Sequence, residues 1–448
     1  MKKVITYGTY DLLHFGHIRL LERAKALGDY LIVGVTSDGF DKVRGKINVQ
    51  QSLMERIEAV KSTGIADEII VEEYEGQKID DIRRLGIDIF TVGSDWVGYF
   101  DYLNEYCDVV YLDRTKGISS SEIREKERSV RIGFIGSKNN KVLSKYYRES
   151  HHVNGVETVG IYCEGNKIKE LDGEEIKNFK THESLLENSD AVYIASDPAA
   201  HYELVKEALL KEKHVLCEAP MALKKEECNE LFEIAKENNL ILMDAIKTAY
   251  STAYNRLLVI VKSGRIGRVV SVDATCTSLA DLSNKEEYIN NNWNSICAWA
   301  PTAMLPILQL LGSDFSSKRI STMYLDEDKK FDSFTKIDFN YDNAVASLKV
   351  GIGAKSEGEL VITGTKGYVY VPAPWWKTDY FEIRHENQEE NKRYFYQLNG
   401  EGIRYEISAF VKAIASATQN RFIDDNVTAK IVDVIESYYD NRDVMVIK

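Results

Sequence analysis

Short apolar runs alternate with segments of helical periodicity along the first 110 residues. KKVITYG, YLIVGVTSD and DEIIVEE are apolar enough to form buried strands, whereas IRLLERAKALG and SLMERIEAVKSTG repeat their apolar residues every three or four positions. After the first strand, Leu20, Ala24 and Leu27 share one helical face, and Gly28 lies where that helix should end. Strands that alternate with helices predict a parallel sheet covered by helices.

The same pattern restarts after a charged run. QKIDDIRRLG, IDIFTVGSDW and CDVVYLDR continue the first series, which ends at REKERS, residues 124–129. SVRIGFIGS opens a second alternating series, and from about residue 250 the strands are longer, with polar alternation and a closing helix at about 402–415. We therefore expect an α/β chain with a Rossmann-like domain at 1–127, a second Rossmann domain at 129–250, and an antiparallel α+β sheet domain at 251–448.

Length, charge and cysteine content narrow the class of protein. A chain of 448 residues exceeds the roughly 250 to 300 residues at which one hydrophobic core stops growing, so two or three domains are expected. The net charge of -13 argues against a general nucleic-acid surface but leaves room for a local phosphate pocket. The six cysteines lack CxxC spacing, which predicts reduced thiols in a cytoplasmic protein. No run resembles a signal peptide or approaches the roughly 18 apolar residues of a membrane span, so no membrane partner is expected.

Two histidines, His14 and His17, lie in GTYDLLHFGH directly after the first strand. That position is the turn and first residues of a helix at the carboxyl edge of the sheet, where open α/β folds bind ligands. Backbone N–H groups and the helix dipole favour a phosphate there, and the imidazoles add two further donors. Gly16 would let phosphate oxygens approach the backbone. The alternative is that both histidines are surface residues at a helix start.

Three ordered motifs resemble the glycerol-3-phosphate cytidylyltransferase family of nucleotidyltransferases over residues 1–127. They are GTYDLLHFGH, GSDWVGYFDYL at 93–103 and RTKGISSSEIR at 114–124. The resemblance implies that CTP is joined to a phosphorylated alcohol with release of pyrophosphate and without a covalent enzyme intermediate. The protein would position the reactants for in-line attack and neutralise charge. Mg²⁺ would be bound mainly by CTP and not by a protein metal site.

The resemblance also implies roles for individual residues. His14, His17, Lys46 and Arg114 would be catalytic, and Arg56 and Tyr74 would contact the acceptor. A tryptophan expected after the third strand is missing, which leaves another small polyol phosphate open as the acceptor. The residues implied in nucleotide binding are Gly8, Thr9, Tyr10, Asp11, Gly16, Asp95, Thr115, Ile118, Ser119 and Ser120.

Each of these roles has a structural alternative. Lys46 and Arg56 could be ordinary solvated charges. Ser119 and Ser120 could belong to a capping sequence before Glu122, and Asp11 could cap the first helix.

Residues 130–448 resemble the Gfo/Idh/MocA oxidoreductases through IGFIG, DAVYIASDPAAHYELVKEALLKEKHVLCEAPM, SGRIG and ITGTKGYVYVP. The resemblance implies a nicotinamide dinucleotide on a Rossmann domain and a sugar or polyol substrate. Where that family has Glu-Lys-Pro, this chain has Glu218, Ala219 and Pro220, so the amine that would assist proton transfer is missing. Lys138 and Lys141 replace small residues in the dinucleotide turn.

The remaining NAD(P) contacts would be Gly136, Glu164 and Glu218. Three functions follow as hypotheses. The first, which we favour, is a cytidylyltransferase that makes a CDP-glycerol-like product for teichoic-acid or capsule synthesis and carries an inactive reductase-like half. The second is a bifunctional enzyme whose NAD(P)-dependent half makes the polyol phosphate. The third is a nucleotide-sensing assembly protein. Because both families imply association, a homodimer is the expected state.

Overall fold

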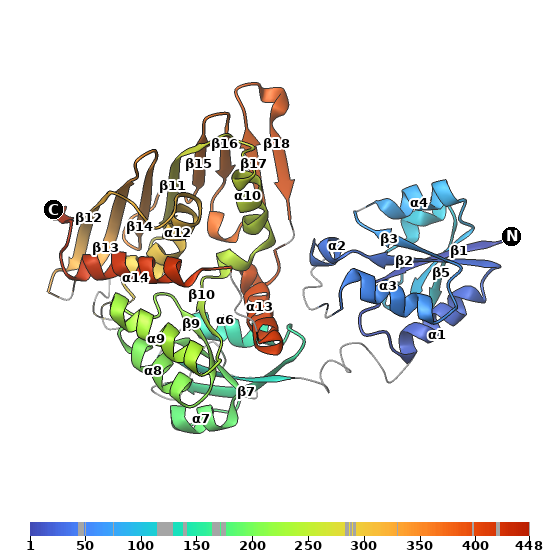
Figure 1. Ribbon diagram of the computed structural model, residues 1–448, viewed down its shortest axis with the longest axis horizontal. Coiled ribbons are helices and arrows are strands. Elements are labelled where there is room, and N and C mark those ends of the chain that lie inside the picture. Colours follow the sequence, from blue (N-terminus) through green and yellow to red (C-terminus); the bar gives the residue numbers. More distant parts are fainter. Residues whose placement is uncertain are drawn as a thin grey trace. The chain divides into compact units, whose positions relative to one another are not determined.

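The computed structural model divides the chain into two compact units, Met1–Ser129 and Val130–Lys448 (Figure 1). The boundary falls at the end of the charged run 124–129. The residues that the structure describes are 1–43, 49, 51–74, 76–113, 129–137, 141–163, 171, 176–282, 286, 289, 293–328, 330–396, 398–417 and 422–447.

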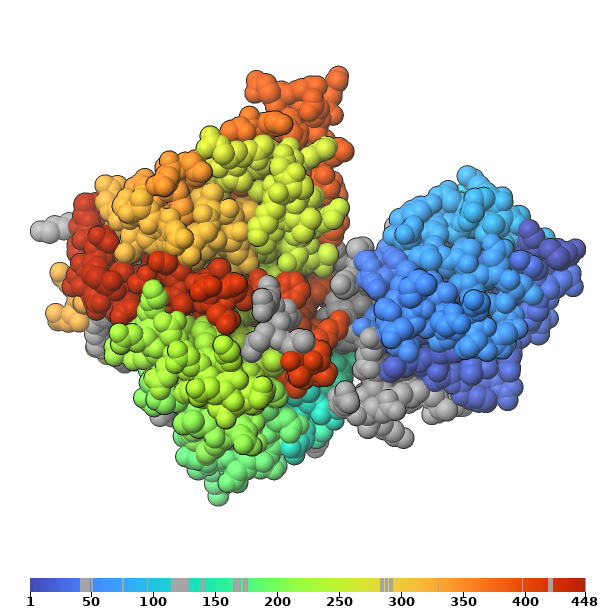
Figure 2. Space-filling model, viewed as in Figure 1, coloured from blue at the N-terminus to red at the C-terminus, as the bar shows by residue number. Residues whose placement is uncertain are grey.

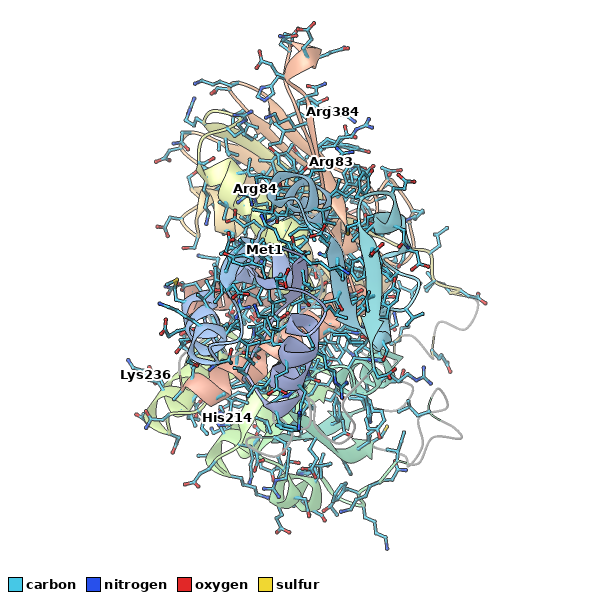
Figure 3. All side chains as sticks on the ribbon, turned by 90° about the vertical axis from the view of Figure 1, so that its right-hand side faces the viewer. Met1, Arg83, Arg84, His214, Lys236 and Arg384 are labelled. Atoms are coloured by element: carbon cyan, nitrogen blue, oxygen red, sulfur yellow. The ribbon has the colours of Figure 1, made fainter. Side chains whose placement is uncertain are left out.

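The first unit is built on a parallel sheet with the strand order β3-β2-β1-β4-β5. Its strands are β1 (Lys3–Gly8), β2 (Tyr30–Thr36), β3 (Glu68–Glu72), β4 (Ile89–Gly93) and β5 (Asp108–Leu112). Its helices are α1 (Phe15–Lys25), α2 (Asp38–Val43), α3 (Leu53–Ser62), α4 (Gln77–Leu85), and the 3-10 turns η1 (Ser94–Trp96) and η2 (Asp101–Glu105). Arg83 and Arg84, labelled in Figure 3, lie in the last turn of α4.

Alternate residues of the strands serve two separate apolar layers. Val4 and Val33 belong to the layer that includes Leu21 and Val60 of α1 and α3, whereas Ile5 packs in the layer under α4. A parallel sheet covered on both faces needs such continuously apolar strands, which is why the first strands read as uninterrupted apolar runs.

The first helix differs in detail from the prediction. It ends at Lys25, and its buried residues are Leu21 and Ala24, while Leu27 is only half-buried. The chain leaves α1 through tighter turns, because the backbone N–H groups of Leu27 and Gly28 each bind a carbonyl three residues earlier. Gly28 is required by packing, since a Cβ there would lie 2.6 Å from the Lys2 carbonyl oxygen.

The second unit begins with another five-stranded parallel sheet, with the order β10-β9-β8-β6-β7. The strands are β6 (Val130–Gly136), β7 (Val156–Cys163), β8 (Ala191–Ala195), β9 (His214–Glu218) and β10 (Leu242–Ala245). The helices are α6 (Lys141–Ser150), α7 (His182–Asn188), α8 (Pro198–Leu210) and α9 (Lys225–Glu237). The expected α/β class with two Rossmann-like sheets is therefore confirmed.

A nine-stranded sheet follows, with the order β18-β17-β16-β15-β11-β14-β13-β12-β19. Its strands are β11 (Val269–Thr277), β12 (Ser317–Asp326), β13 (Phe331–Asn340), β14 (Val345–Gly351), β15 (Leu360–Gly364), β16 (Tyr368–Val371), β17 (Tyr380–Arg384), β18 (Lys392–Phe395) and β19 (Val444–Val446). The elements around it include η4 (Lys247–Tyr250), α10 (Thr252–Lys262), α12 (Ser295–Leu311), η5 (Trp375–Lys377), η7 (Gly400–Gly402), α13 (Ile403–Ser416) and α14 (Asp425–Tyr439).

The sheet predicted to be antiparallel is mixed: most of its strand pairs are antiparallel, but two are parallel. β11 pairs in parallel with β14, and β12 with β19. Long connections make this possible: α12 and a hairpin separate β11 from β14, and β19 arrives only after α14.

The closing helix predicted near 402–415 is α13, but the chain then adds α14. The red helix α14 runs between the green helices of the Rossmann layer and the orange sheet (Figure 2), and it packs against both α9 and α12. Among the residues that the structure describes, no helix is both long and apolar enough to cross a membrane. The division of this unit at residue 250 stays a prediction.

Candidate functional site

The loop from β1 to α1 has an unusual backbone. Tyr10 and Leu12 have φ angles of 53° and 47°, in the left-handed region that costs a residue other than glycine about 1 kcal/mol or more. A Cβ on Gly8 would lie 2.9 Å from Cζ of Tyr10, so only glycine leaves room for that ring to fold back over the end of β1. Tyr10 is buried in the core of the first unit, and burial raises the pKa of its hydroxyl. The turn is thus held by packing in a conformation that is not intrinsically favoured.

The two histidines meet at the start of α1. Their rings are stacked, with centroids 4.0 Å apart and planes at 19°. His14 is the N-cap residue, and its Nδ1 accepts a hydrogen bond from the Gly16 backbone N–H at 3.0 Å. A ring nitrogen that accepts this bond carries no proton, so the neutral ring has its proton on Nε2, which makes Nε2 a donor. No acidic residue occupies the first turn of α1, which keeps the helix start favourable for an anion.

A buried arginine joins this loop to the two that follow. The Arg56 guanidinium is fully buried, and its Nη1 donates to the carbonyl oxygens of Thr9 at 2.7 Å and Thr36 at 2.8 Å. Its Nε donates to the Gln51 carbonyl at 3.1 Å, and its Nη2 binds the Asp38 carboxylate. Arg56 is therefore not the solvated charge of the alternative interpretation. Its predicted contact with the acceptor stays a prediction.

The same loops are cross-linked by Gln51 and Asp11. The Gln51 backbone N–H donates to Asp11 Oδ1 at 2.9 Å, and the Leu12 N–H donates to Gln51 Oε1 at 2.8 Å. Asp11 thus ties the loop to the start of α3, while His14 caps α1, so the alternative role of Asp11 as the cap of α1 is wrong. Sequence reasoning missed Gln51 and Asp38. The available signals were the capping box of Ser52 and Glu55, which directly follows Gln51, and the position of Asp38 just after β2.

The other predicted site residues are spread more widely. Tyr74 is half exposed, and its hydroxyl donates to Asp80 at 2.9 Å. Asp95 lies in η1 after β4, at the same carboxyl edge of the sheet as the β1 loop. Several predicted residues lie outside the described part of the chain, namely Lys46, Arg114, Thr115, Ile118, Ser119, Ser120 and, in the second unit, Glu164.

In the second unit, Glu218 ends β9 within a cluster of buried polar groups. The Tyr193 hydroxyl donates to Glu218 Oε1 at 2.5 Å, and the Tyr146 hydroxyl binds the Glu406 carboxyl group. The two tyrosine rings are stacked at 4.0 Å. Burial raises the pKa of Glu218 to about 7, against the lowering effect of Tyr193 and Lys247. Burial also raises the pKa of Glu406 well above its usual range.

Gly136 and His201 have structural partners. A Cβ on Gly136 would lie 2.6 Å from Cδ2 of Leu143 and 3.3 Å from the Ala195 carbonyl oxygen, so this glycine allows α6 to pack closely on β6. His201 is fully buried, with its ring nitrogens 2.8 Å from the Pro220 carbonyl oxygen and 3.1 Å from that of Ser196. Burial lowers the pKa of His201. It supports the turn after β9.

One group of side chains in the described residues has the spacing of metal ligands. Within them, His182, Glu183 and Glu207 are the group whose ligand atoms lie within 4.8 Å of one another, and they belong to the second unit. His182 Nε2 lies 2.7 Å from a Glu207 oxygen, which a surface ion pair explains.

Comparison with known proteins separates the two units. Residues 5–126 match the family model described as cytidylyltransferase-like, and residues 130–245 match that of the oxidoreductase family with an NAD-binding Rossmann fold. A glycerol-3-phosphate cytidylyltransferase of Bacillus spizizenii is 49% identical over 130 residues, which are 29% of this chain and 100% of that protein. Its counterpart from Staphylococcus aureus is 46% identical over 126 residues, 28% of this chain and 95% of that protein.

The second unit shares its fold with solved structures. KijD10, a 3-ketoreductase from Actinomadura kijaniata solved with NADP and TDP-benzene, covers 72% of this chain and 100% of its own, with a TM-score of 0.63 and 16% identity. At that identity the likeness concerns the fold alone. The matches agree with both resemblances that the motifs indicated.

Proposed function

The chain belongs to the glycerol-3-phosphate cytidylyltransferase family through its first unit, and from this premise we propose that it transfers CMP from CTP to glycerol-3-phosphate or a closely related polyol phosphate. The products are a CDP-alcohol and pyrophosphate. The observation that carries the proposal is the 49% identity over the full length of a relative bearing that name. The stacked His14 and His17 rings at the start of α1 support it, because they place donors where a phosphate is favoured.

The residues of the site act by positioning and by charge stabilisation. An acceptor phosphate oxygen attacks the α-phosphorus of CTP while the bond to the pyrophosphate oxygen breaks, so negative charge grows on the equatorial and leaving oxygens. His14 donates from Nε2 toward this charge, and His17 lies beside it on the first turn of α1. Arg56 holds the carbonyls of the surrounding loops, which keeps both rings in place without a rearrangement during the reaction.

Mg²⁺ is proposed to accompany CTP and to neutralise its phosphates. In the described part of the first unit, no three His, Cys, Asp or Glu side chains come together as a metal site. In this proposal the cation is therefore held mainly by the phosphates of the nucleotide and by water, as Mg²⁺ prefers.

Pyrophosphate release from CTP and Mg²⁺ tests the proposal. The acceptors are glycerol-3-phosphate, glycerol-2-phosphate, dihydroxyacetone phosphate and ribitol-5-phosphate. We expect turnover with one of them, and a loss of about a hundredfold or more in His17→Ala. The matched control is His152→Ala, which replaces an exposed histidine of the second unit and should keep full activity. Silence with all acceptors in a protein that still binds CTP would instead favour the nucleotide-sensing role.

For the second unit we propose a scaffold without oxidoreductase activity. Two features of the sequence support this: Ala219 stands where the resembling family has its lysine, and Lys138 and Lys141 replace small residues in the dinucleotide turn. Titration with NADH and NADPH, followed by fluorescence, tests it. Tight binding together with reduction of a ketone phosphate would favour the bifunctional alternative. We further propose that the CDP-alcohol serves teichoic-acid or capsule synthesis. We also propose that the protein is a homodimer, which sedimentation velocity tests.

A further inference from the structure

Three lysines of the second unit converge on one carboxylate. Lys145 Nζ and Lys247 Nζ each lie 3.1 Å from Glu401 Oε2, and Lys377 Nζ lies 3.4 Å from Glu401 Oε1. The lysines come from α6, η4 and η5, which are far apart in the sequence. Lys247 follows β10, at the carboxyl edge of the parallel sheet where open α/β folds receive ligands.

The charges at this point do not balance. Three ammonium groups face a single carboxylate, and Lys247 and Lys377 are only 25% and 33% exposed. Two further acids, Glu218 and Glu406, lie near Lys247. Burial raises the pKa of Glu406 well above its usual range and that of Glu218 to about 7, so together they offset only part of the excess positive charge. A net positive site inside a chain of charge -13 is unusual and favours a ligand with more negative charge than one carboxylate supplies.

Helix α13 adds to the positive potential. It starts at Ile403, and its N-cap residue is Gly402, which has no side chain with which to cap the first N–H groups. The partial positive charge of a helix start attracts anions, and Gly402 directly follows Glu401, whose carboxylate the three lysines bind. The first turn also holds Glu406, but burial raises the pKa of this acid well above its usual range, which favours its neutral form.

Glu401 lies in a turn with a left-handed backbone, and this turn brings its carboxylate to the lysines. Gly400, Glu401 and Gly402 have φ angles of 56°, 54° and 92°. Glycine tolerates this left-handed region, but glutamate is strained in it. Burial opposes ionisation of Glu401, but Lys247 and then Lys145 and Lys377 outweigh it and lower its pKa to about 2. The ion pairs of the three lysines with the Glu401 carboxylate thus stabilise the strained backbone at residues 400–402.

We propose that Lys145, Lys247 and Lys377 form a binding site for the phosphate group of a small phosphomonoester, and that Glu401 occupies this site in the unliganded chain. A phosphate dianion offers three oxygens and two charges to three ammonium groups, so it satisfies them better than the carboxylate does. Binding displaces Glu401 and releases the strained turn at the start of α13. The inference concerns the second unit and does not rest on the activity proposed for the first.

Isothermal titration of the full chain with inorganic phosphate and with glycerol-3-phosphate tests the site, with glycerol as the uncharged control. Binding to the first unit is common to all variants, because every substitution lies in the second unit. Glu401→Gln should bind phosphate about tenfold more tightly than the wild type, and Lys247→Met and Lys377→Met about tenfold more weakly. The matched control is Lys206→Met, which removes a comparable lysine whose Nζ lies 2.6 Å from Glu230. Its affinity should equal that of the wild type.

Equal phosphate affinity in all of these variants would overturn the proposal. The same variants are also titrated with NADP⁺, and lysine variants that lose affinity for NADP⁺ but not for phosphate would overturn it as well. Glu401→Gly guards against misfolding of the turn, because glycine suits the left-handed backbone, and it should show the same tighter binding as Glu401→Gln. Pyrophosphate release is measured on every variant in parallel. Unchanged release with altered phosphate affinity assigns the effect to the second unit, whereas absent release in the wild type would count against the function proposed for the first unit alone.

Discussion

Arg56 on α3 donates a hydrogen bond from Nη1 to the carbonyl oxygen of Thr9, 2.7 Å away and 47 residues earlier in the chain. The same nitrogen binds the Thr36 carbonyl at the end of β2. One guanidinium therefore holds the loops that follow β1 and β2, and through Gln51 also the start of α3. His14 ends the first of these loops and His17 lies in the first turn of α1, so the position of the pair depends on a side chain that need not touch a ligand.

Replacing Arg56 should loosen this arrangement. Arg56→Met leaves buried carbonyl oxygens without donors, and we expect the free energy of unfolding of the first unit to fall by about 2 to 4 kcal/mol. Arg56→Lys keeps the charge but not the planar fork, and it should give an intermediate loss together with a raised KM for CTP. Urea denaturation and pyrophosphate release measure both effects. Lys61→Met, at an exposed position on the same helix, is the control. An Arg56→Met variant as stable as the wild type would contradict this account.

The two functions of His14 can be separated. Asparagine is a good N-cap residue, so His14→Asn should keep the start of α1 and change the stability by less than about 0.5 kcal/mol, whereas His14→Ala should lose about 1 kcal/mol. Both variants lack the Nε2 donor, and both should lose pyrophosphate release by about a hundredfold or more. Thermal unfolding and initial rates with saturating CTP are the measurements. If His14→Asn retained activity, the histidine would be a cap and not a catalytic group.

The raised pKa of Glu218 predicts a pH dependence of stability. Burial raises the pKa to about 7 in the folded state, above the ordinary glutamate value of 4.5. Between these values the folded state binds more protons than the unfolded state, so the contribution to stability is complete below about pH 4.5 and is lost as the pH rises through 7. Because Glu218 is partly exposed, we expect a contribution of about 1 to 2 kcal/mol.

Denaturant unfolding at a series of pH values checks this contribution. The decline in stability between pH 5 and 7 should be smaller in Glu218→Gln than in the wild type, since glutamine does not titrate in this range. Glu237→Gln, an exposed glutamate at the end of α9, should reproduce the wild-type curve. Parallel curves for Glu218→Gln and the wild type would show that Glu218 ionises normally in the folded chain.

Gly136 is expected to act through packing. In Gly136→Ala the new methyl group meets Leu143 on α6, and the second unit should lose about 1 to 3 kcal/mol of stability. Leu143→Ala alone should also be destabilising, but the double variant should lose less than the sum, because each change relieves the other. A double-mutant cycle by chemical denaturation measures the coupling. Strict additivity would mean that the methyl group is accommodated elsewhere.

Much of the fold could be predicted from local pattern. The apolar runs and the intervening helical periods correctly indicated two parallel sheets, because strands buried on both faces must be continuously apolar. The parallel pairs β11–β14 and β12–β19 were not predicted. Pairing direction depends on where long connections bring a strand back, and alternation of polar residues is the same in parallel and antiparallel neighbours.

The site shows the same division. The sequence by itself determined which chemistry is present: the histidine pair after the first strand, the family of the first unit, and the replacement of lysine by Ala219 in the second. Only the tertiary structure decided which distant side chains come into contact. Arg56 binds the carbonyls of Thr9 and Thr36. Glu401 forms ion pairs with Lys145, Lys247 and Lys377. The reason is physical: motifs and periodicities are local, whereas burial and ion pairing join residues that only the folded chain brings within bonding distance.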